Sequence, residues 1–368
     1  MATAADSFLV IFGLLPLSSG RVIVNDLGRR QVALFDSTLR ESRPLIDNTG
    51  SAPRRYTGLL TGPYRGTGDS TVLYDASAQA MLVLDASGTI ARVTAPPFAV
   101  VPIAPAGDGR GHLVFALNAP DAAMPDSALG AGGRPIVDSL LLIRADLTTR
   151  RTDTIAKVAE AARYIGAPGV DSCGIAFFRT RINPLPSADG WAVLSNGTVA
   201  VVRARDLHID WIGLDGTTSA SPKLPHEWHR LTDSDKVALV DSLKTRPAIG
   251  PAAPLALMDP RIPPACRTAN IAARMPDFPE PANLADYAAP FPVTGGVFAD
   301  ADDDLWIQTD ANPSGGVGPV YLVVDTGGAV IDRVQIPGGT TIAGFAPGIV
   351  FLKGRTGGAT RLVEARIR

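Results

Sequence analysis

The chain has 368 residues, of which 46% are hydrophobic and 19% are charged. This length and composition allow a large buried core, exclude wholesale disorder, and leave room for two ordinary domains or one repeat architecture. The formal net charge of -2 and the scattered basic residues exclude an extended nucleic-acid surface.

The first apolar run, SFLVIFGLLPL at residues 7–17, predicts a β-strand. A secretory signal peptide is the alternative, but Asp6 precedes the run, no Lys or Arg does, and no small-residue cleavage site follows closely. The run is too short to cross a bilayer as a helix, and no other run is long enough.

A pair of apolar strands separated by a polar turn then recurs along the chain. It occurs as GRVIVNDLGRRQVALFDSTL at residues 20–39 and as STVLYDASAQAMLVLDASGTI at residues 70–90. The second strand recurs as LLLIRAD, IDWIGLD and VYLVVD, and in altered form as RLVEARI near the C-terminus. Six hairpins of this kind, most preceded by a further short strand, predict an all-β, six-bladed β-propeller.

An aspartate ends most of these strands, and we interpret it as a turn-forming residue. A carboxylate at that place accepts backbone N–H groups two or three residues further on. A catalytic role does not fit, because equivalent turns of different blades lie far apart. The aspartates are Asp26, Asp36, Asp75, Asp85, Asp146, Asp215 and Asp325.

These lines, together with DDLWIQT and VYLVVDTGGAVIDRVQIP, resemble the blade pattern of bacterial six-bladed propellers of the NHL/TolB-like type. The resemblance covers nearly the whole chain and implies the fold more than a function. It also implies a place outside the cytoplasm, in the periplasm or secreted, whereas the lack of a clear signal peptide leaves a cytoplasmic place open. The C-terminal TRLVEARI is expected to pair with SFLVIFG and close the ring.

The repeat is interrupted between blades four and five by an insertion of about residues 224–292, within one domain spanning residues 1–368. Thr232 followed by Asp235, with Pro247 as a stop, predicts a helix over about residues 232–245. Val237, Val240 and Leu243, with Leu239 alongside, form its expected apolar face. The insertion is interpreted either as a cap packed on the blades or as a lid or partner-docking surface.

Motifs for catalysis are weak. HEWH (residues 226–229) lacks the HExxH spacing, and His112 and His208 fall on different blades. DADDDLW (residues 300–306) lacks the full EF-hand pattern, which favours a solvated turn over a Ca²⁺ site. Lactonase-type propellers hold an axial metal through acidic residues of innermost strands, but the first candidate strand, GLLPLSSG, has none. No cofactor and no catalytic or metal-binding residue is therefore predicted.

Basic and aromatic residues near the expected blade entrances are the candidate ligand-binding groups, since Arg and Tyr suit anionic or sugar-like ligands. The alternative is ordinary solvated loops and strand ends. The candidates are Arg55, Tyr56, Tyr64, Arg65, Arg179 and Arg181. Their spacing does not distinguish a small ligand from a protein partner.

The two cysteines, Cys173 and Cys266, have no CxxC spacing. They are interpreted either as a disulfide pinning the insertion or as two buried thiols. Taken together, the sequence favours a non-enzymatic binding or interaction module that uses the channel mouth and the insertion. A metal-dependent hydrolase of the lactonase or gluconolactonase type is the alternative.

Overall fold

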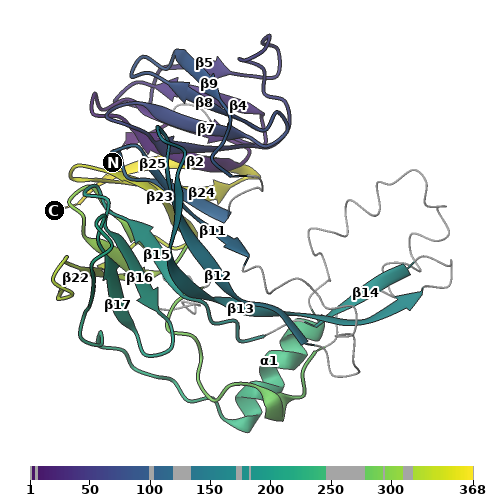
Figure 1. Cartoon of the computed structure of the whole chain (residues 1–368). Coiled ribbons are helices and arrows are strands. Elements are labelled where there is room, and N and C mark those ends of the chain that lie inside the picture. The colour runs from purple at the N-terminus through teal and green to yellow at the C-terminus, as the bar shows by residue number, and fades with distance from the viewer. Residues whose placement is uncertain are drawn as a thin grey trace.

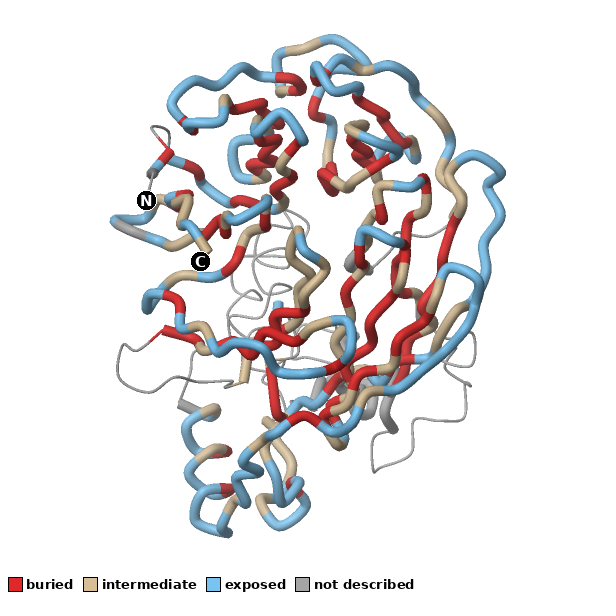
Figure 2. Tube along the Cα trace, turned by 90° about the vertical axis from the view of Figure 1, so that its left-hand side faces the viewer, coloured by how far each residue is buried: buried red, intermediate tan, exposed pale blue. Residues whose placement is uncertain are grey.

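The computed structural model describes residues 2–4, 7–98, 103–118, 134–170, 176–181, 184–245, 278–292, 295–309 and 318–367. These residues form six antiparallel sheets of four or five strands. Each sheet uses strands that are consecutive in the chain, except that β1 joins the last one. The sheets surround a common centre, which is the arrangement of a six-bladed propeller (Figure 2).

The first three sheets contain the strands β2 to β14. Their bounds are β2 (Ile11–Pro16), β3 (Val22–Asp26), β4 (Gln31–Phe35), β5 (Ser42–Ile46), β6 (Leu60–Arg65), β7 (Thr71–Asp75), β8 (Ala80–Leu84), β9 (Ile90–Thr94), β10 (Ile103–Gly107), β11 (His112–Asn118), β12 (Arg134–Asp146), β13 (Thr152–Val170) and β14 (Ala176–Arg181).

The last three sheets contain the strands β15 to β25 and β1. Their bounds are β15 (Gly190–Val193), β16 (Val199–Arg203), β17 (His208–Ile212), β18 (Thr218–Ala220), β19 (Val297–Ala299), β20 (Leu305–Gln308), β21 (Val320–Val324), β22 (Val330–Gln335), β23 (Thr340–Ala346), β24 (Ile349–Thr356), β25 (Ala359–Arg366) and β1 (Ala2–Thr3). Between the fourth and fifth sheets lie the helix α1 (Asp233–Thr245) and the short 3₁₀ helix η2 (Pro281–Asn283).

The second and third strands of a sheet carry most of the core. In β3 all five residues are buried, because neighbouring blades cover both faces of the strand. The first-to-second and second-to-third seams are filled by apolar clusters, and Phe98 places its ring 5.0 Å from the rings of both Tyr74 and Phe115. The outer strand β18, in contrast, is exposed throughout. The second and third strands of each sheet are therefore largely apolar runs, whereas an outermost strand such as β18 is polar.

The turn aspartates behave as expected. Oδ1 of Asp26 accepts the N–H groups of Gly28 and Arg29, and Oδ1 of Asp85 accepts those of Ser87 and Thr89. The remaining members of the set make equivalent bonds, at Asp36, Asp75, Asp146, Asp215 and Asp325.

The ring closes through its ends, although with a different segment from the one expected. β1 pairs antiparallel with β25, and Phe8 bridges Thr360. The predicted closing segment, SFLVIFG, pairs with the last sheet through the Phe8 bridge, and the backbone oxygens of Leu9 and Ile11 accept side-chain bonds from Thr360 and Lys353. It does not form the edge strand, because residues from Ile11 onward form β2, the innermost strand of the first blade.

The third sheet differs from the others. It has five strands, and β14 with the far part of β13 extends away from the rest of the propeller (Figure 1). The stretch FFRTRINPLP, expected at the entrance to the fourth blade, instead supplies this outermost strand of the third sheet. Strand propensity alone does not distinguish an innermost from an outermost strand, which explains the error.

Candidate functional site

The candidate site is the central channel, a cavity of about 370 Å³ lined by all six innermost strands. These strands follow one another around the ring in the order β23, β2, β6, β10, β15 and β19. Their glycines allow this close approach: a Cβ on Gly13 would lie 2.5 Å from the carbonyl oxygen of Gly62, and one on Gly107 would lie 1.9 Å from that of Arg65. Small residues at these positions therefore set the width of the channel.

The channel wall is largely apolar and aromatic. Phe12 on β2 is 44% exposed, and Tyr64 on β6 lies in the same wall. Phe298 on β19 and Phe345 on β23 complete the aromatic lining. Burial raises the pKa of Tyr64 well above its ordinary value, so its hydroxyl keeps its proton and can donate a hydrogen bond.

Two carboxylates line the channel, and both already accept hydrogen bonds from their own turns. Oδ1 of Asp108 accepts the N–H groups of Arg110 and His112, while Oδ2 lies 2.7 Å from Nδ1 of His112. Asp300 accepts the N–H groups of Asp302 and Asp304 through Oδ1, and Nε1 of Trp306 through Oδ2. These carboxylates therefore shape the β-turns at the channel end.

Arg65 is the basic residue of this wall, and its guanidinium is not engaged. It forms no hydrogen bond and no ion pair with any residue in the described ranges. Its charge contributes to the lowered pKa of nearby Asp69, although the side-chain and backbone bonds from Ser18 contribute more. The five N–H donors of the Arg65 guanidinium therefore have no acceptor among the described residues.

The other predicted site residues do not all join Arg65. Tyr56 is 2% exposed, and its hydroxyl donates to Oδ1 of Asn25 at 3.0 Å, so it packs between the first two blades. Arg55 is exposed on the loop before β6. Arg65 is the last residue of β6 and lies about 17 Å along the strand from its first residue. Of the predicted residues whose side chains the structure describes, Tyr64 and Arg65 alone line the channel.

Arg179 and Arg181 were expected at the channel mouth, whereas the strand that carries them lies at the opposite edge of the third sheet from its innermost strand. Both lie on β14, four strands away from β10 in the same sheet. At about 4.8 Å per strand, that separation is about 19 Å or more. Their side chains lie outside the described part of the structure, as do Cys173 and Cys266, so the disulfide stays a prediction.

Sequence reasoning named no residue of β10 or β15, or of the turns that follow them, as a site residue. Asp108 follows β10, and Ser195 follows β15 and donates from Oγ to Oδ2 of Asp303 at 2.7 Å. The signal was the short Ala, Pro and Gly stretch PIAPAGDG, which lies one strand upstream of the clear apolar run GHLVFALN. Such a stretch has low strand propensity, although it serves as an innermost strand.

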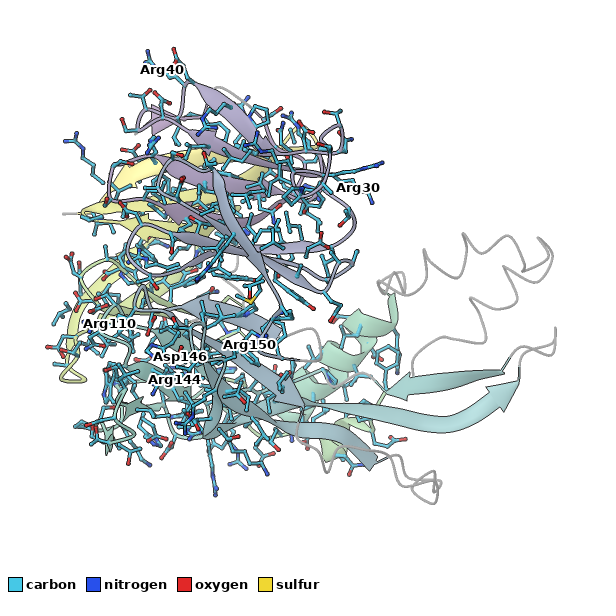
Figure 3. The ribbon with its side chains drawn as sticks, turned by 45° about the horizontal axis from the view of Figure 1, so that its top comes forward. Arg30, Arg40, Arg110, Arg144, Asp146 and Arg150 are labelled. Atoms are coloured by element: carbon cyan, nitrogen blue, oxygen red, sulfur yellow. The ribbon has the colours of Figure 1, made fainter. Side chains whose placement is uncertain are left out.

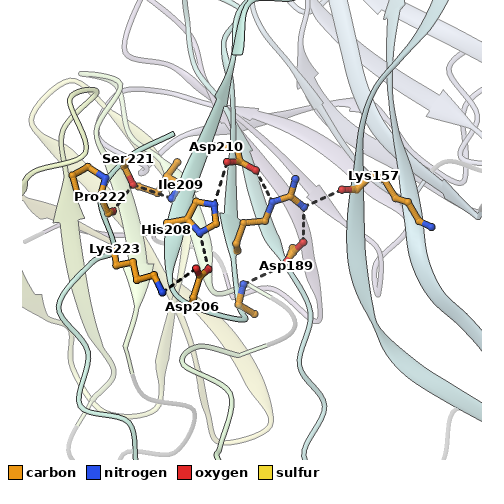
Figure 4. A network of polar contacts seen from close by, with 11 residues as sticks. Lys157, Asp189, Asp206, His208, Ile209, Asp210, Ser221, Pro222 and Lys223 are labelled. Atoms are coloured by element: carbon orange, nitrogen blue, oxygen red, sulfur yellow. Dashed lines mark hydrogen bonds and ion pairs between the residues drawn. The ribbon is translucent and has the colours of Figure 1, made fainter. Parts of the chain in front are cut away.

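The histidines do not gather into one site. His208 lies between Asp206 and Asp210, at 2.6 Å and 3.2 Å, in a network around Arg203 on the fourth blade (Figure 4). His112 pairs with Asp108 at the channel end of the third blade. Within the described ranges, no group of three or more His, Cys, Asp or Glu side chains is placed to hold a metal ion.

Hydrogen bonds hold the turn at residues 300–306 in place. Asp303 bonds Ser195 of the neighbouring blade, and Asp300 caps its own turn. Burial and the nearby carboxylates of Asp300 and Asp302 raise the pKa of Asp304. These contacts agree with the interpretation as a turn.

The seam between the third and fourth blades holds a buried arginine. The guanidinium of Arg144 on β12 donates to the backbone oxygens of Gly213, Leu214 and Gly197, at 3.1 to 3.2 Å. Arg144 and Asp146 line one cavity at this seam, and both are labelled in Figure 3. Nε of Arg110 donates to the backbone oxygen of Ser195. Both arginines therefore join the two blades.

The insertion contains the predicted helix, and its cap is a capping box. Thr232 and Asp235 exchange hydrogen bonds, with Asp235 N donating to Thr232 Oγ1 at 3.2 Å. The buried face differs from the predicted one. Val240 and the side chain of Lys236 are buried, whereas Val237 is exposed.

The helix packs against η2, the returning part of the insertion. Nζ of Lys236 donates to the carbonyl oxygen of Leu284 and to Oδ1 of Asp286, which fixes the two segments together. Beside them, the exposed rings of Trp228 and Tyr287 lie edge to face at 6.4 Å. The insertion therefore presents an exposed aromatic pair.

No protein-family model matches the sequence, and no curated protein is similar to it. Its structure is similar to a member of the DUF4221 family from Bacteroides vulgatus, with 8% identity, a TM-score of 0.46, and coverage of 100% of this chain and 96% of that one. It is also similar to the calcium-binding protein regucalcin from Agrobacterium tumefaciens, with 12% identity, a TM-score of 0.35, and coverage of 100% and 95%.

A third similar structure is a catalytically inactive virginiamycin B lyase from Staphylococcus aureus with quinupristin. The identity is 8%, the TM-score is 0.39, and the coverage is 99% of this chain and 98% of that one. At these scores none of the likenesses bears on what this chain binds. In the described part of the chain, no helix is both long and apolar enough to pass through a bilayer.

Proposed function

We propose that this propeller is a non-enzymatic binding module that accepts a small organic anion, such as a sugar acid or an aromatic carboxylate, in its channel. The observation that carries the proposal is the guanidinium of Arg65, which has no partner among the described residues and shares the channel wall with aromatic and aliphatic side chains as well as Asp108, Ser195 and Asp300. A guanidinium fork matches a carboxylate in geometry and charge. The aromatic rings of the wall supply flat surfaces for the body of the ligand.

The size of the channel supports the proposal. A cavity of about 370 Å³ falls within the range of about 300–1,000 Å³ that small-molecule sites occupy. Asp108 and Asp300 each accept three hydrogen bonds from their surroundings, so their oxygens are held in their own turns, and the guanidinium of Arg65 is the group of the wall that attracts an anion.

The test is calorimetric titration with benzoate, gluconate and inorganic phosphate, beside the neutral analogues benzamide and glucose. Arg65→Ala should weaken the binding of any anion in the panel at least tenfold, with little change in melting temperature. Arg92→Ala is the matched control, because Arg92 is exposed on the outer strand β9. Anion binding that is equally strong in Arg65→Ala and in the wild type would contradict the proposal.

A metal-dependent hydrolase of the lactonase type is the alternative function. Such an enzyme needs several ligands converging on an axial ion. Among the described residues, the channel wall supplies Asp108 and Asp300 as its carboxylates, and both are engaged in turns. Lactone hydrolysis that requires added Ca²⁺ or Zn²⁺, and that is lost in Asp300→Asn, would favour this alternative.

We further propose that residues 1–368 act as one domain, with the exposed pair Trp228 and Tyr287 of the insertion as a second contact surface. We also propose that the protein is related to NHL/TolB-like propellers and that it is located outside the cytoplasm. Both proposals rest on the blade motifs, and fractionation of cells that express the native gene tests the place directly.

A further inference from the structure

A second cavity, of about 410 Å³, lies at the seam between the sixth and first blades. The segment before β2, the start of β23, the end of β24 and Thr360 of β25 line it. It shares no lining residue with the channel. The two cavities are therefore separate sites.

The polar end of this cavity is formed by Lys353. Its Nζ donates to the backbone oxygen of Ile11 at 3.2 Å, and it forms no ion pair with any residue that the structure describes. Burial lowers the pKa of Lys353, with no carboxylate contributing. A partly desolvated ammonium with one backbone acceptor has further donors for an anion.

Arg355 lines the same cavity two residues further along β24. It is exposed, and within the described ranges its guanidinium has no hydrogen-bond or ion-pair partner. None of the lining residues is acidic. The cavity thus carries two cationic side chains and no carboxylate to balance them.

The opposite wall is apolar and held in place. Leu9 and Val10 line this cavity and are each 49% exposed, so about half of the surface of each residue remains open to solvent. Their backbone N–H groups donate to Oδ2 and Oδ1 of Asp26, both at 2.9 Å. Asp26 is itself buried. A ligand would therefore meet an apolar wall whose backbone is already ordered.

We propose that this cavity binds a small carboxylate with a hydrocarbon chain. The carboxylate would pair with Lys353 and Arg355, and the chain would cover Leu9 and Val10. Charge complementarity fixes the head of the ligand, because the lining is cationic only. The half-exposed aliphatic wall fixes the tail, because its burial is favourable only for an apolar partner.

The experiment is titration calorimetry of the full chain with decanoate below its micelle concentration, beside hexanoate, acetate and decan-1-ol. Decanoate should bind at one site, and affinity should rise about three- to fourfold for each methylene that contacts the wall. Acetate and decan-1-ol should each bind at least tenfold more weakly, because each lacks one half of the ligand.

Variants assign the binding to this cavity. Lys353→Met should weaken decanoate binding at least tenfold, and Val10→Ser should weaken it about threefold. Lys244→Met is the matched control, because Lys244 is an exposed helix residue whose partner is Asp241. Lys353→Met should leave benzoate binding in the channel unchanged, which separates this site from the channel.

Three outcomes would overturn the proposal: no saturable decanoate binding, equal binding of decan-1-ol, or equal affinities of Lys353→Met and Lys244→Met. If Lys353→Met does not fold, the affinity of Arg355→Gln for decanoate tests the site instead. Arg355 is exposed and without a described partner, so its replacement leaves the fold intact. An unchanged affinity in that variant would equally refute the site.

Discussion

The network around Arg203 offers a direct test of how two blades are held together. Nη1 of Arg203 donates to Oδ2 of Asp189 at 2.7 Å and to the backbone oxygen of Lys157, in the third blade, at 2.9 Å. Nε donates to Oδ2 of Asp210 at 2.7 Å (Figure 4). One guanidinium therefore joins two carboxylates of its own blade to the backbone of its neighbour.

The cost of Arg203→Met follows from the burial of these groups. Breaking a fully buried ion pair costs about 3–5 kcal/mol, and an exposed pair contributes about 1 kcal/mol or less. The side chain of Arg203 is 25% exposed and that of Asp189 is 6% exposed. Asp189 also keeps the N–H groups of Ala159 and Ala204 as donors. The expected loss in the free energy of unfolding is therefore about 2–3 kcal/mol.

Equilibrium unfolding in urea measures this loss. Arg205→Met is the matched control, because Arg205 is exposed two residues away, and it should change stability by less than about 0.5 kcal/mol. A double-mutant cycle with Asp189→Asn should give a coupling energy of at least about 1 kcal/mol. A loss in Arg203→Met no larger than that in Arg205→Met would refute this account of the seam.

Three further predictions concern ring closure, the first seam and the turns. Phe8→Ala should lower the free energy of unfolding by about 3 kcal/mol, because Phe8 is buried against Phe35. The control Leu9→Ala should cost less than about 1 kcal/mol, because Leu9 is half exposed, and equal melting temperatures of the two variants would contradict this prediction. Asn25→Leu should lower the free energy of unfolding by about 2–3 kcal/mol, because the buried amide donates to the backbone oxygens of Leu60 and Gly62 and accepts the Tyr56 hydroxyl. In equilibrium unfolding with urea, the control Asn48→Leu should leave stability unchanged, because Asn48 is exposed. Hydrogen bonds from Ser87 lower the pKa of Asp85, so its contribution to stability is fully present above the ordinary value of 3.8 and is lost as pH falls through the folded-state pKa. Melting temperatures from pH 6 down to pH 3 should therefore fall less steeply in Asp85→Asn than in the wild type, and parallel curves would argue against the turn bond.

Local patterns in the sequence were sufficient for the architecture. The repeated apolar strands and the aspartates that end them depend on interactions within a few residues, such as the bonds from Ser87 and Thr89 to Asp85. The capping box of Thr232 and Asp235 is equally local, and it correctly predicted α1. These features are set by chain neighbours, so the sequence determined the propeller fold and the inserted helix.

The channel and the second cavity were decided only by the tertiary structure. Tyr64 and Arg65 line the channel together with residues of the five other innermost strands, because each blade contributes one short strand to the centre. An innermost strand such as β10 is rich in Ala, Pro and Gly, whereas the outermost strand β14 has the aromatic pattern expected of a core strand. Strand propensity does not encode the distance from the axis. That distance is set by how six blades pack in a ring, and it decides which arginine lines the channel.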